Sequence, residues 1–195
     1  MKTTITHITK SALVLLVLFT LFSFKPAAAS EGNISETEKY AWSENAGWIN
    51  FRPTHGGVTV LDTYLSGYAW AENIGWIKLG NDNGGAYNNT TATDWGVNND
   101  GSGNLSGYAW SEIAGWINFN PSNSQVTIDL GTGSFDGYAW AENVGWIHFK
   151  NAEPAYNVKA ILPDSDGDGL SDALEDTTCT DKNDADTDND GILDG

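Results

Sequence analysis

Tyr40-Ala-Trp-Ser-Glu-Asn-Ala-Gly-Trp-Ile-Asn-Phe51 contains two short runs of aromatic and β-branched residues, separated by a polar segment that ends in glycine. This pattern is typical of a β-hairpin. Asn and Gly tolerate the left-handed backbone that the turn of such a hairpin needs. The pattern occurs four times and includes eight of the nine tryptophans, in repeat cores 39–51, 67–79, 107–119 and 137–149. The sequence therefore predicts four tandem aromatic hairpins.

A further short run of strand-forming residues precedes copies two, three and four, at 58–60, 95–97 and 126–128. Each run is followed by residues typical of a turn, at 65–67, 105–107 and 135–137. The repeat unit is therefore predicted to have three strands, and a run at 156–158 is predicted to supply a closing strand. About ten additional residues between copies two and three, rich in Asn, Gly and Thr, are predicted to form a surface loop.

The region 30–160 shows no helical spacing of apolar residues, so we expect an all-β domain built from four tandem three-stranded units. Units of about 30 residues are short for the four-stranded blades of a propeller. This length favours stacked units, prism-like units or a sandwich assembled from hairpins, and the sequence does not select among the three.

Residues 1–29 have the features of a secretory signal peptide: a basic start, an apolar stretch from Ala12 to Phe24, and small residues ending at Ala29. The apolar stretch is short for a membrane span, and no second one of spanning length follows. We therefore expect a secreted protein, located outside the cell or at its surface, with no transmembrane segment after cleavage.

The chain is strongly acidic, with a formal net charge of −17. Removal of residues 1–29, which carry three lysines and no acid, makes the charge −20. A protein of this charge is not expected to bind nucleic acid, and it should attract cations. Because Cys179 is the single cysteine, no internal disulfide can form, and the fold must depend on its apolar core, on bound metal, or on both.

The second tryptophan of each copy is predicted to be exposed. Alternate residues of a strand share a face, so Ile77 and Leu79 lie together and Trp76 shares its face with Lys78. The position of Lys78 is polar in every copy, which marks this face as hydrated. Each second tryptophan is also expected to pair across its hairpin with the first. The candidate ligand-binding residues are Trp48, Trp76, Trp116 and Trp146.

Two interpretations of these aromatic residues remain open. In the structural one, the rings fill the seams between units, because a single repeat cannot bury its apolar face alone. In the functional one, exposed rings bind sugars or protein partners, and polar neighbours supply hydrogen bonds, namely Glu44, Glu72, Glu112, Glu142, Asn45, Asn73 and Asn143. Four equivalent glutamates suit a scaffold better than catalysis, since catalytic carboxylates need distinct environments.

From Asp164 onward the composition changes sharply, to twelve acids and the single base Lys182. Residues 164–175 fit the twelve-residue calcium loop, with oxygen-bearing side chains at positions 1, 3, 5, 9 and 12 and glycine at position 6. Calcium takes six to eight oxygen ligands, and the glycine lets the chain wrap around the ion. The predicted ligands are the carboxylates of Asp164, Asp166, Asp168, Asp172 and Glu175 and the carbonyl of Leu170.

A second loop begins 22 residues later and stops before position 12, and its predicted ligands are Asp186, Asp188, Asp190 and Asp194. Either the sequence is a fragment, or water or another group completes this loop. Residues 161–195 are therefore predicted to be a loop-rich tail with Ca²⁺ as cofactor. Without metal the carboxylates should repel one another and leave the tail disordered, whereas bound calcium should make it rigid.

The tail resembles thrombospondin type 3 repeats, including their shorter forms in bacterial surface proteins. The resemblance implies acidic loops that have little core, fold around calcium ions and act as stalks or spacers, with the same carboxylates as ligands. The tail departs from that family in its lone Cys179, where vertebrate members pair their cysteines, and in its incomplete second loop. The hairpin pattern GYAWxENxGWIxF resembles tandem repeats of secreted bacterial proteins of uncharacterised function.

These features favour a non-catalytic extracellular protein with a surface, adhesion or structural role, whose partners are glycans or cell-surface proteins. The alternative is a carbohydrate-binding module that uses the hairpin tryptophans. An enzyme is the third hypothesis, and the sequence gives it no support: His55 and His148 lie in no recognisable metal or nucleophile motif, and we assign no catalytic residue.

Overall fold

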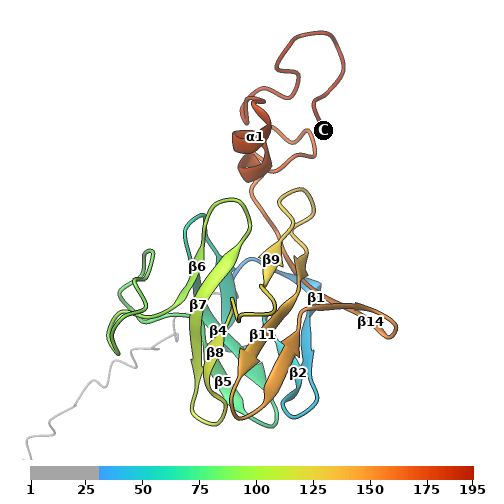
Figure 1. The fold of residues 1–195 in the computed structure, drawn as a ribbon. Helices are drawn as coiled ribbons and strands as arrows, with labels where there is room; N and C mark the ends of the chain where they lie inside the picture. Colours follow the sequence, from blue (N-terminus) through green and yellow to red (C-terminus); the bar gives the residue numbers. More distant parts are fainter. Residues whose placement is uncertain (1–30) are drawn as a thin grey trace, which may run out of the picture.

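The computed structural model describes residues 31–195, which form a β-barrel with the acidic tail projecting from one end (Figure 1). The predicted signal peptide lies outside the described residues. The all-β class is confirmed: residues 31–195 contain fourteen strands and one short helix, α1 (Asp172–Thr178), which lies in the tail.

The four repeat hairpins close into an eight-stranded antiparallel barrel. Their strands are β1 (Ile34–Ser43) with β2 (Gly47–Asn50), β4 (Leu65–Ala71) with β5 (Gly75–Lys78), β7 (Leu105–Ser111) with β8 (Gly115–Asn118), and β11 (Tyr138–Ala141) with β12 (Gly145–His148). Each hairpin pairs with the next, and β12 returns to β1 through Trp42 and His148. The ring therefore leaves no free edge. The sequence predicted the hairpins, but their closure into one ring differs from the three arrangements that it suggested.

Short outer strands extend the hairpins at one end of the barrel. The strands β3 (Gly57–Val60) and β6 (Val97–Asn99) pair with β4 and β7, and β9 (Thr127–Ile128) pairs with β10 (Phe135–Asp136) just before β11. The predicted closing strand is confirmed as β14 (Ala155–Ala160), which pairs with β1 and with β13 (Lys150–Ala152). The first hairpin thus receives its third strand from the end of the domain.

The turns predicted at 65–67, 105–107 and 135–137 are wrong. Leu65 and Leu105 begin the strands β4 and β7, and residue 137 joins β10 directly to β11. The glycines Gly67, Gly107 and Gly137 have φ angles of +89°, +84° and +86°. A Cβ atom at these positions would lie 2.0, 2.2 and 2.0 Å from the backbone oxygens of Gly57 in β3, Gly96 just before β6 and Gln125 just before β9. Glycine here lets one strand bend closely over another, and it does not reverse the chain.

The interior of the barrel is filled by the residues that alternate with the tryptophans. Ala41, Ile49 and Phe51 of the first copy are buried, and so are their equivalents in the other copies: Ala69, Ile77, Leu79, Ala109, Ile117, Phe119, Ala139, Ile147 and Phe149. A small alanine faces a larger isoleucine across each hairpin, which suits the narrow interior of an eight-stranded barrel. The phenylalanine rings meet one another, for example Phe51 and Phe149 at 5.4 Å between centroids.

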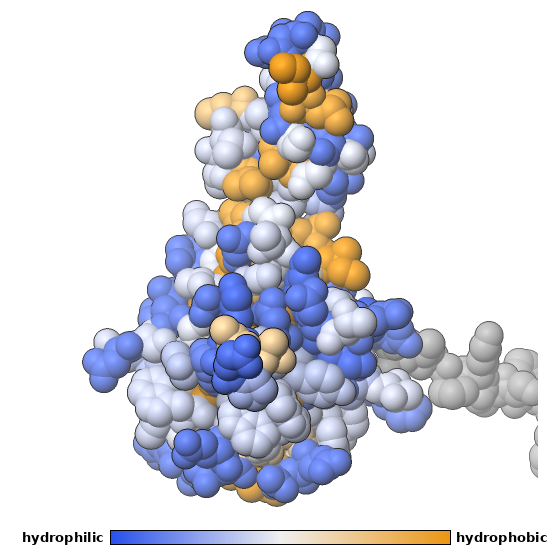
Figure 2. All heavy atoms as spheres, turned by 90° about the vertical axis from the view of Figure 1, so that its right-hand side faces the viewer, coloured by the Kyte–Doolittle hydropathy of each residue, from blue (hydrophilic) through white to orange (hydrophobic). Residues whose placement is uncertain are grey.

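The tail contacts the barrel through the start of α1. Ser171 caps the helix by accepting a hydrogen bond from the Leu174 amide, and its hydroxyl donates to the carbonyl of Leu130 in the turn between β9 and β10. Leu174 also packs close to Gly131 of the same turn. Figure 2 shows hydrophobic residues gathered where the molecule narrows between the barrel and the tail. Among residues 31–195 no helix is long and apolar enough to cross a membrane.

Candidate metal centre and aromatic surface

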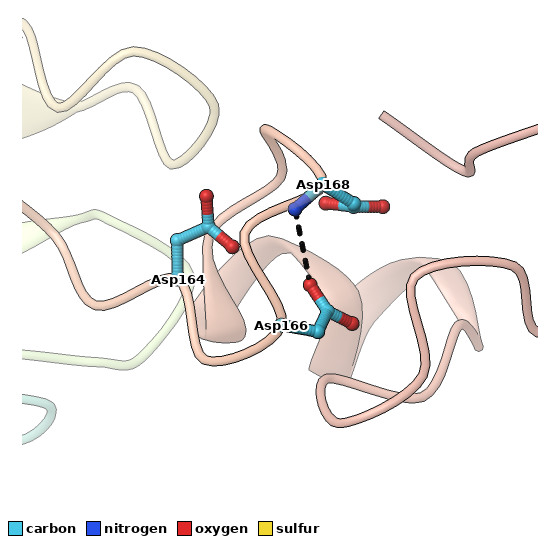
Figure 3. A group of neighbouring side chains, drawn as sticks. All are labelled: Asp164, Asp166 and Asp168. Atoms are coloured by element: carbon cyan, nitrogen blue, oxygen red, sulfur yellow. Dashed lines mark hydrogen bonds between the residues drawn. The ribbon is translucent and has the colours of Figure 1, made fainter.

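Three aspartates of the first loop come together at alternate positions of one tight turn (Figure 3). Carboxylate oxygens of Asp164, Asp166 and Asp168 lie within 4.8 Å of one another. Backbone amides fix the first two: Gly167 and Gly169 donate to Asp164 at 2.8 and 3.3 Å, and Asp168 donates to Asp166 at 3.3 Å. The loop backbone therefore holds a group of acids in a geometry that could accommodate a metal ion.

Glu175 closes the first loop from α1 and is fully buried, with 0% of its surface exposed. Neither of its carboxylate oxygens makes a well-formed hydrogen bond, and the same holds for one oxygen of Asp166 and one of Asp168; the Thr180 side chain is the one donor that acts to lower the Glu175 pKa. Burial and the charges of Asp166, Asp168 and Asp172 raise the pKa of Glu175. Buried polar groups normally have partners, and an unpaired buried carboxylate is costly. A cation among these oxygens would remove that cost.

The other two predicted ligands of the first loop are placed differently. Asp172 accepts hydrogen bonds from the amide and hydroxyl of Ser165, at 2.7 and 2.8 Å. Its carboxylate therefore holds the loop together, at a position that in calcium loops often reaches the ion through water. Leu170 donates its amide to Asp168 at 2.7 Å, and the role of its carbonyl as a ligand stays a prediction.

The second loop repeats this conformation. Oxygens of Asp186, Asp188 and Asp190 also lie within 4.8 Å of one another. Four hydrogen bonds match those of the first loop: Gly191 to Asp186 at 2.8 Å, Asp190 to Asp188 at 3.1 Å, Ile192 to Asp190 at 2.9 Å, and Thr187 to Asp194 at 3.0 Å. Two segments with different surroundings thus adopt the same carboxylate arrangement, and the predicted ligand Asp194 takes the same part as Asp172.

Position 4 of each loop has a special backbone conformation that the aspartate spacing did not predict. Gly167 and Asn189 occupy it with φ angles of +76° and +59°, a left-handed conformation that Gly and Asn tolerate best. The presence of Gly and Asn at this position could have predicted the left-handed conformation from the sequence. Packing between the loops was also not foreseen: a Cβ atom on Gly195 would lie 2.8 Å from the carbonyl oxygen of Asp168, so the end of the second loop rests on the first.

Each hairpin carries a cluster of three rings on the outside of the barrel. Trp48, Trp76, Trp116 and Trp146 are 46%, 43%, 44% and 42% exposed, as the alternation predicted. Each lies edge-on against the first tryptophan of its hairpin, at 4.7 or 4.8 Å between centroids, and against the tyrosine, at 6.0 or 6.1 Å. The predicted cross-strand pairs are confirmed. The rings cover the outer side of the seams, and the interior is filled by Ala, Ile, Leu and Phe.

Asparagine and serine side chains tie neighbouring hairpins together. Asn45 donates to the carbonyl of Val144 at 3.1 Å, and Asn143 donates to the carbonyl of Ile113 at 3.0 Å. Ser111 donates to the carbonyl of Ile74 at 3.1 Å. The amide nitrogens of these two asparagines, which were predicted to serve a ligand, therefore serve the barrel. The four repeat glutamates are exposed and have no hydrogen-bond or ion-pair partner among residues 31–195.

Three surface grooves follow the seams between hairpins, with volumes of about 710, 890 and 640 Å³. In each, the tyrosine and second tryptophan of one hairpin face the first tryptophan and the glutamate of the next. The lining residues are Tyr40, Trp48, Trp70 and Glu72 in the first groove, Tyr108, Trp116, Trp140 and Glu142 in the second, and Tyr138, Trp146, Trp42 and Glu44 in the third. The repeat thus builds the same aromatic and acidic surface three times.

Comparison of the chain with protein-family models, with curated proteins and with solved structures finds no match. The interpretation of the metal centre and of the grooves therefore rests on their geometry.

Proposed function

We propose that this protein is a secreted calcium-binding protein with a non-catalytic surface, adhesion or structural role. In this proposal the two acidic loops bind Ca²⁺, and the barrel presents a surface to partners outside the cell. The observation that carries the calcium assignment is the buried carboxylate of Glu175, which has no well-formed hydrogen bond and faces the charges of Asp166 and Asp168. One divalent cation would compensate several acids at once.

The donor atoms favour calcium over other metals. The tail offers carboxylate and backbone oxygens, it contains no histidine, and the exposed Cys179 belongs to neither group of aspartates. Zinc and the later transition metals prefer nitrogen and sulfur ligands. Magnesium demands near-octahedral geometry and retains water, whereas calcium accepts six to eight oxygens, including a bidentate glutamate at position 12. Glu175 occupies that position.

The predicted signal peptide gives the loops a suitable setting. Extracellular modules bind calcium with dissociation constants of about 10⁻⁴ to 10⁻³ M, because calcium is abundant outside cells. At millimolar calcium, loops of this affinity would be between about half and nine-tenths occupied. A filled tail would then act as a firm connection at one end of the barrel, as the contact of Ser171 with Leu130 suggests.

Calorimetric titration of the full chain with calcium tests this proposal. We expect two sites in the unmodified protein and the loss of one site in each of Asp166→Asn and Asp188→Asn. Glu112→Gln removes the same charge from an exposed position on the barrel and should leave both sites intact. Absence of any binding heat at millimolar calcium, or stronger binding of magnesium, would contradict the assignment.

The exposed tryptophans favour a second function, ligand binding by the barrel, for which the sequence suggested glycans. A polysaccharide pull-down with the unmodified protein and with Trp76→Ala and Trp146→Ala tests that suggestion. Retention of the unmodified protein and loss of retention in the variants would support carbohydrate binding, and no retention of the unmodified protein would remove it.

A further inference from the structure

The seam between the second and third hairpins holds a lysine ammonium against the aromatic cluster of its own hairpin. In every seam one residue lies opposite the first tryptophan of the next hairpin, and in this seam Lys78 lies opposite Trp110. The equivalent residues are Asn50, Asn118 and His148. The ammonium nitrogen of Lys78 lies 5.7 Å from the centroid of the Tyr68 ring, a distance typical of a cation–π contact.

Lys78 is held in this place and is not a freely solvated side chain. Its side chain is 22% exposed, and its nitrogen lies 2.6 Å from a carboxylate oxygen of Asp82. The second hairpin therefore supplies its own ammonium to its tyrosine, and an acid balances the charge. The Lys39 ammonium lies 5.8 Å from the Tyr40 ring of the first hairpin, but Lys39 does not line the groove at that seam. The other three seams have the same rings and an unpartnered glutamate, and their opposite residues are Asn50, Asn118 and His148.

We propose that the three grooves at the other seams bind the alkylated ammonium group of a small organic cation in solution, of the choline type. In each groove the tyrosine and the two tryptophans would contact the methyl groups, and Glu72, Glu142 or Glu44 would face the positive charge. Aromatic faces attract such cations through their quadrupole, most strongly where water is excluded. This proposal concerns the barrel alone and does not depend on calcium binding by the tail.

The angles between the rings favour a compact cation over a sugar. Within the hairpins that face the three grooves, the planes of the tyrosine and tryptophan rings meet at angles between 62° and 79°, while the His148 ring stacks flat on Tyr138 at 4.0 Å between centroids. Two rings from outside the repeats continue this arrangement: Tyr156 stands at 85° to Trp48 and Trp95 at 77° to Trp116, both at 5.2 Å. Steeply inclined rings surround a rounded group from several sides. A pyranose ring needs instead one broad, flat face for stacking.

Charge supports the same choice. No lysine or arginine lines any of the three grooves, and each has a glutamate without an ion-pair partner among residues 31–195. The whole chain has a formal charge of −17, so its field attracts cations and repels anions. An anionic ligand would find no counter-charge in these grooves, whereas an ammonium would find both a carboxylate and aromatic faces.

A pair of isosteric probes separates charge from shape. Choline and 3,3-dimethylbutan-1-ol have the same shape, but the second has carbon in place of the charged nitrogen. In a titration of the full chain followed by tryptophan fluorescence and calorimetry, we expect saturable binding of choline, and binding of the neutral alcohol weaker by about tenfold or more. Equal binding of both probes, no binding of choline, or binding only to oligosaccharides or to phosphatidylcholine vesicles would overturn the proposal.

Isosteric variants test the residues. The triple variant Glu44→Gln, Glu72→Gln, Glu142→Gln should bind choline more weakly by about fivefold, whereas Glu112→Gln, at the same hairpin position beside Lys78, should bind as the unmodified protein does. Lys78→Asn should raise the number of choline sites from three to four. The glutamates are exposed, so these changes leave the barrel folded. An unchanged affinity in the triple variant, or an unchanged number of sites in Lys78→Asn, would contradict the assignment.

Discussion

The barrel and the tail bury opposite kinds of side chain. The barrel interior contains Ala, Ile, Leu and Phe, and its backbone is paired around a closed ring. The tail buries the acid Glu175 among other acids and contains few apolar residues. Apolar burial stabilises a fold in water by itself, whereas a buried group of acids requires a counter-ion. The two regions should therefore respond differently to the same perturbations.

Removal of divalent cations should have the largest effect and should act on the tail alone. With chelator, repulsion among the carboxylates should abolish amide-exchange protection throughout α1 and both loops, while the barrel amides keep theirs. Hydrogen exchange of the full chain with and without calcium measures this. Equal protection of the tail in both conditions would mean that it folds without metal.

Truncation of a side chain in the barrel core should destabilise the barrel and leave the tail unchanged. Phe149 is buried and contacts Phe51, Phe119 and Phe135, so Phe149→Ala should lower the free energy of unfolding of the barrel by about 3–5 kcal/mol. Denaturant unfolding measures this loss. Calcium affinity measured by calorimetry under native conditions should not change. If barrel stability and calcium affinity fell together, the tail would need an intact barrel.

The effect of Glu175→Gln should be unfavourable when calcium is bound and favourable when calcium is absent. With metal bound, loss of one anionic ligand should weaken the first site by at least about 10- to 100-fold, the range that loss of a residue supporting a ligand already costs. Without metal, the same change removes a buried charge that faces Asp166, Asp168 and Asp172, so α1 should become more ordered. Circular dichroism with chelator and calorimetry with calcium give the two readings. A loss of helix in both conditions would argue that Glu175 has a packing role only.

Ser171→Ala should have the smallest effect and should act at the junction. It removes the helix cap and the hydrogen bond to Leu130, at a cost of about 1 kcal/mol for a lost cap. Exchange of the α1 amides should become faster by about fivefold. Ser102→Ala, on an exposed turn of the barrel, is the control and should leave α1 unchanged.

The spacing of residues close together in the sequence predicted the exposure of the strand residues and the two groups of aspartates. Both depend on short-range patterns: strand exposure alternates every two residues, and each group of aspartates lies within one loop. Alternation placed Ile77 inside and Trp76 outside, and the aspartate spacing predicted both groups of acids. The closure of the barrel was not predictable in this way, since it depends on Trp42 meeting His148 more than a hundred residues later. Gly67 was misinterpreted for a similar reason: the signal for a turn and for a close strand crossing is the same residue. The role of Asp172 depended on Ser165, whose backbone it holds.

The pairing of β1 with both β12 and β14 has a consequence for how the repeat can vary in number. In a solenoid each unit contacts its neighbours alone, so units can be gained or lost and the array merely becomes longer or shorter. Here the first and last units pair with each other, and removing a single copy would leave a gap in the barrel. A change in the number of copies would therefore require a barrel with a different number of strands.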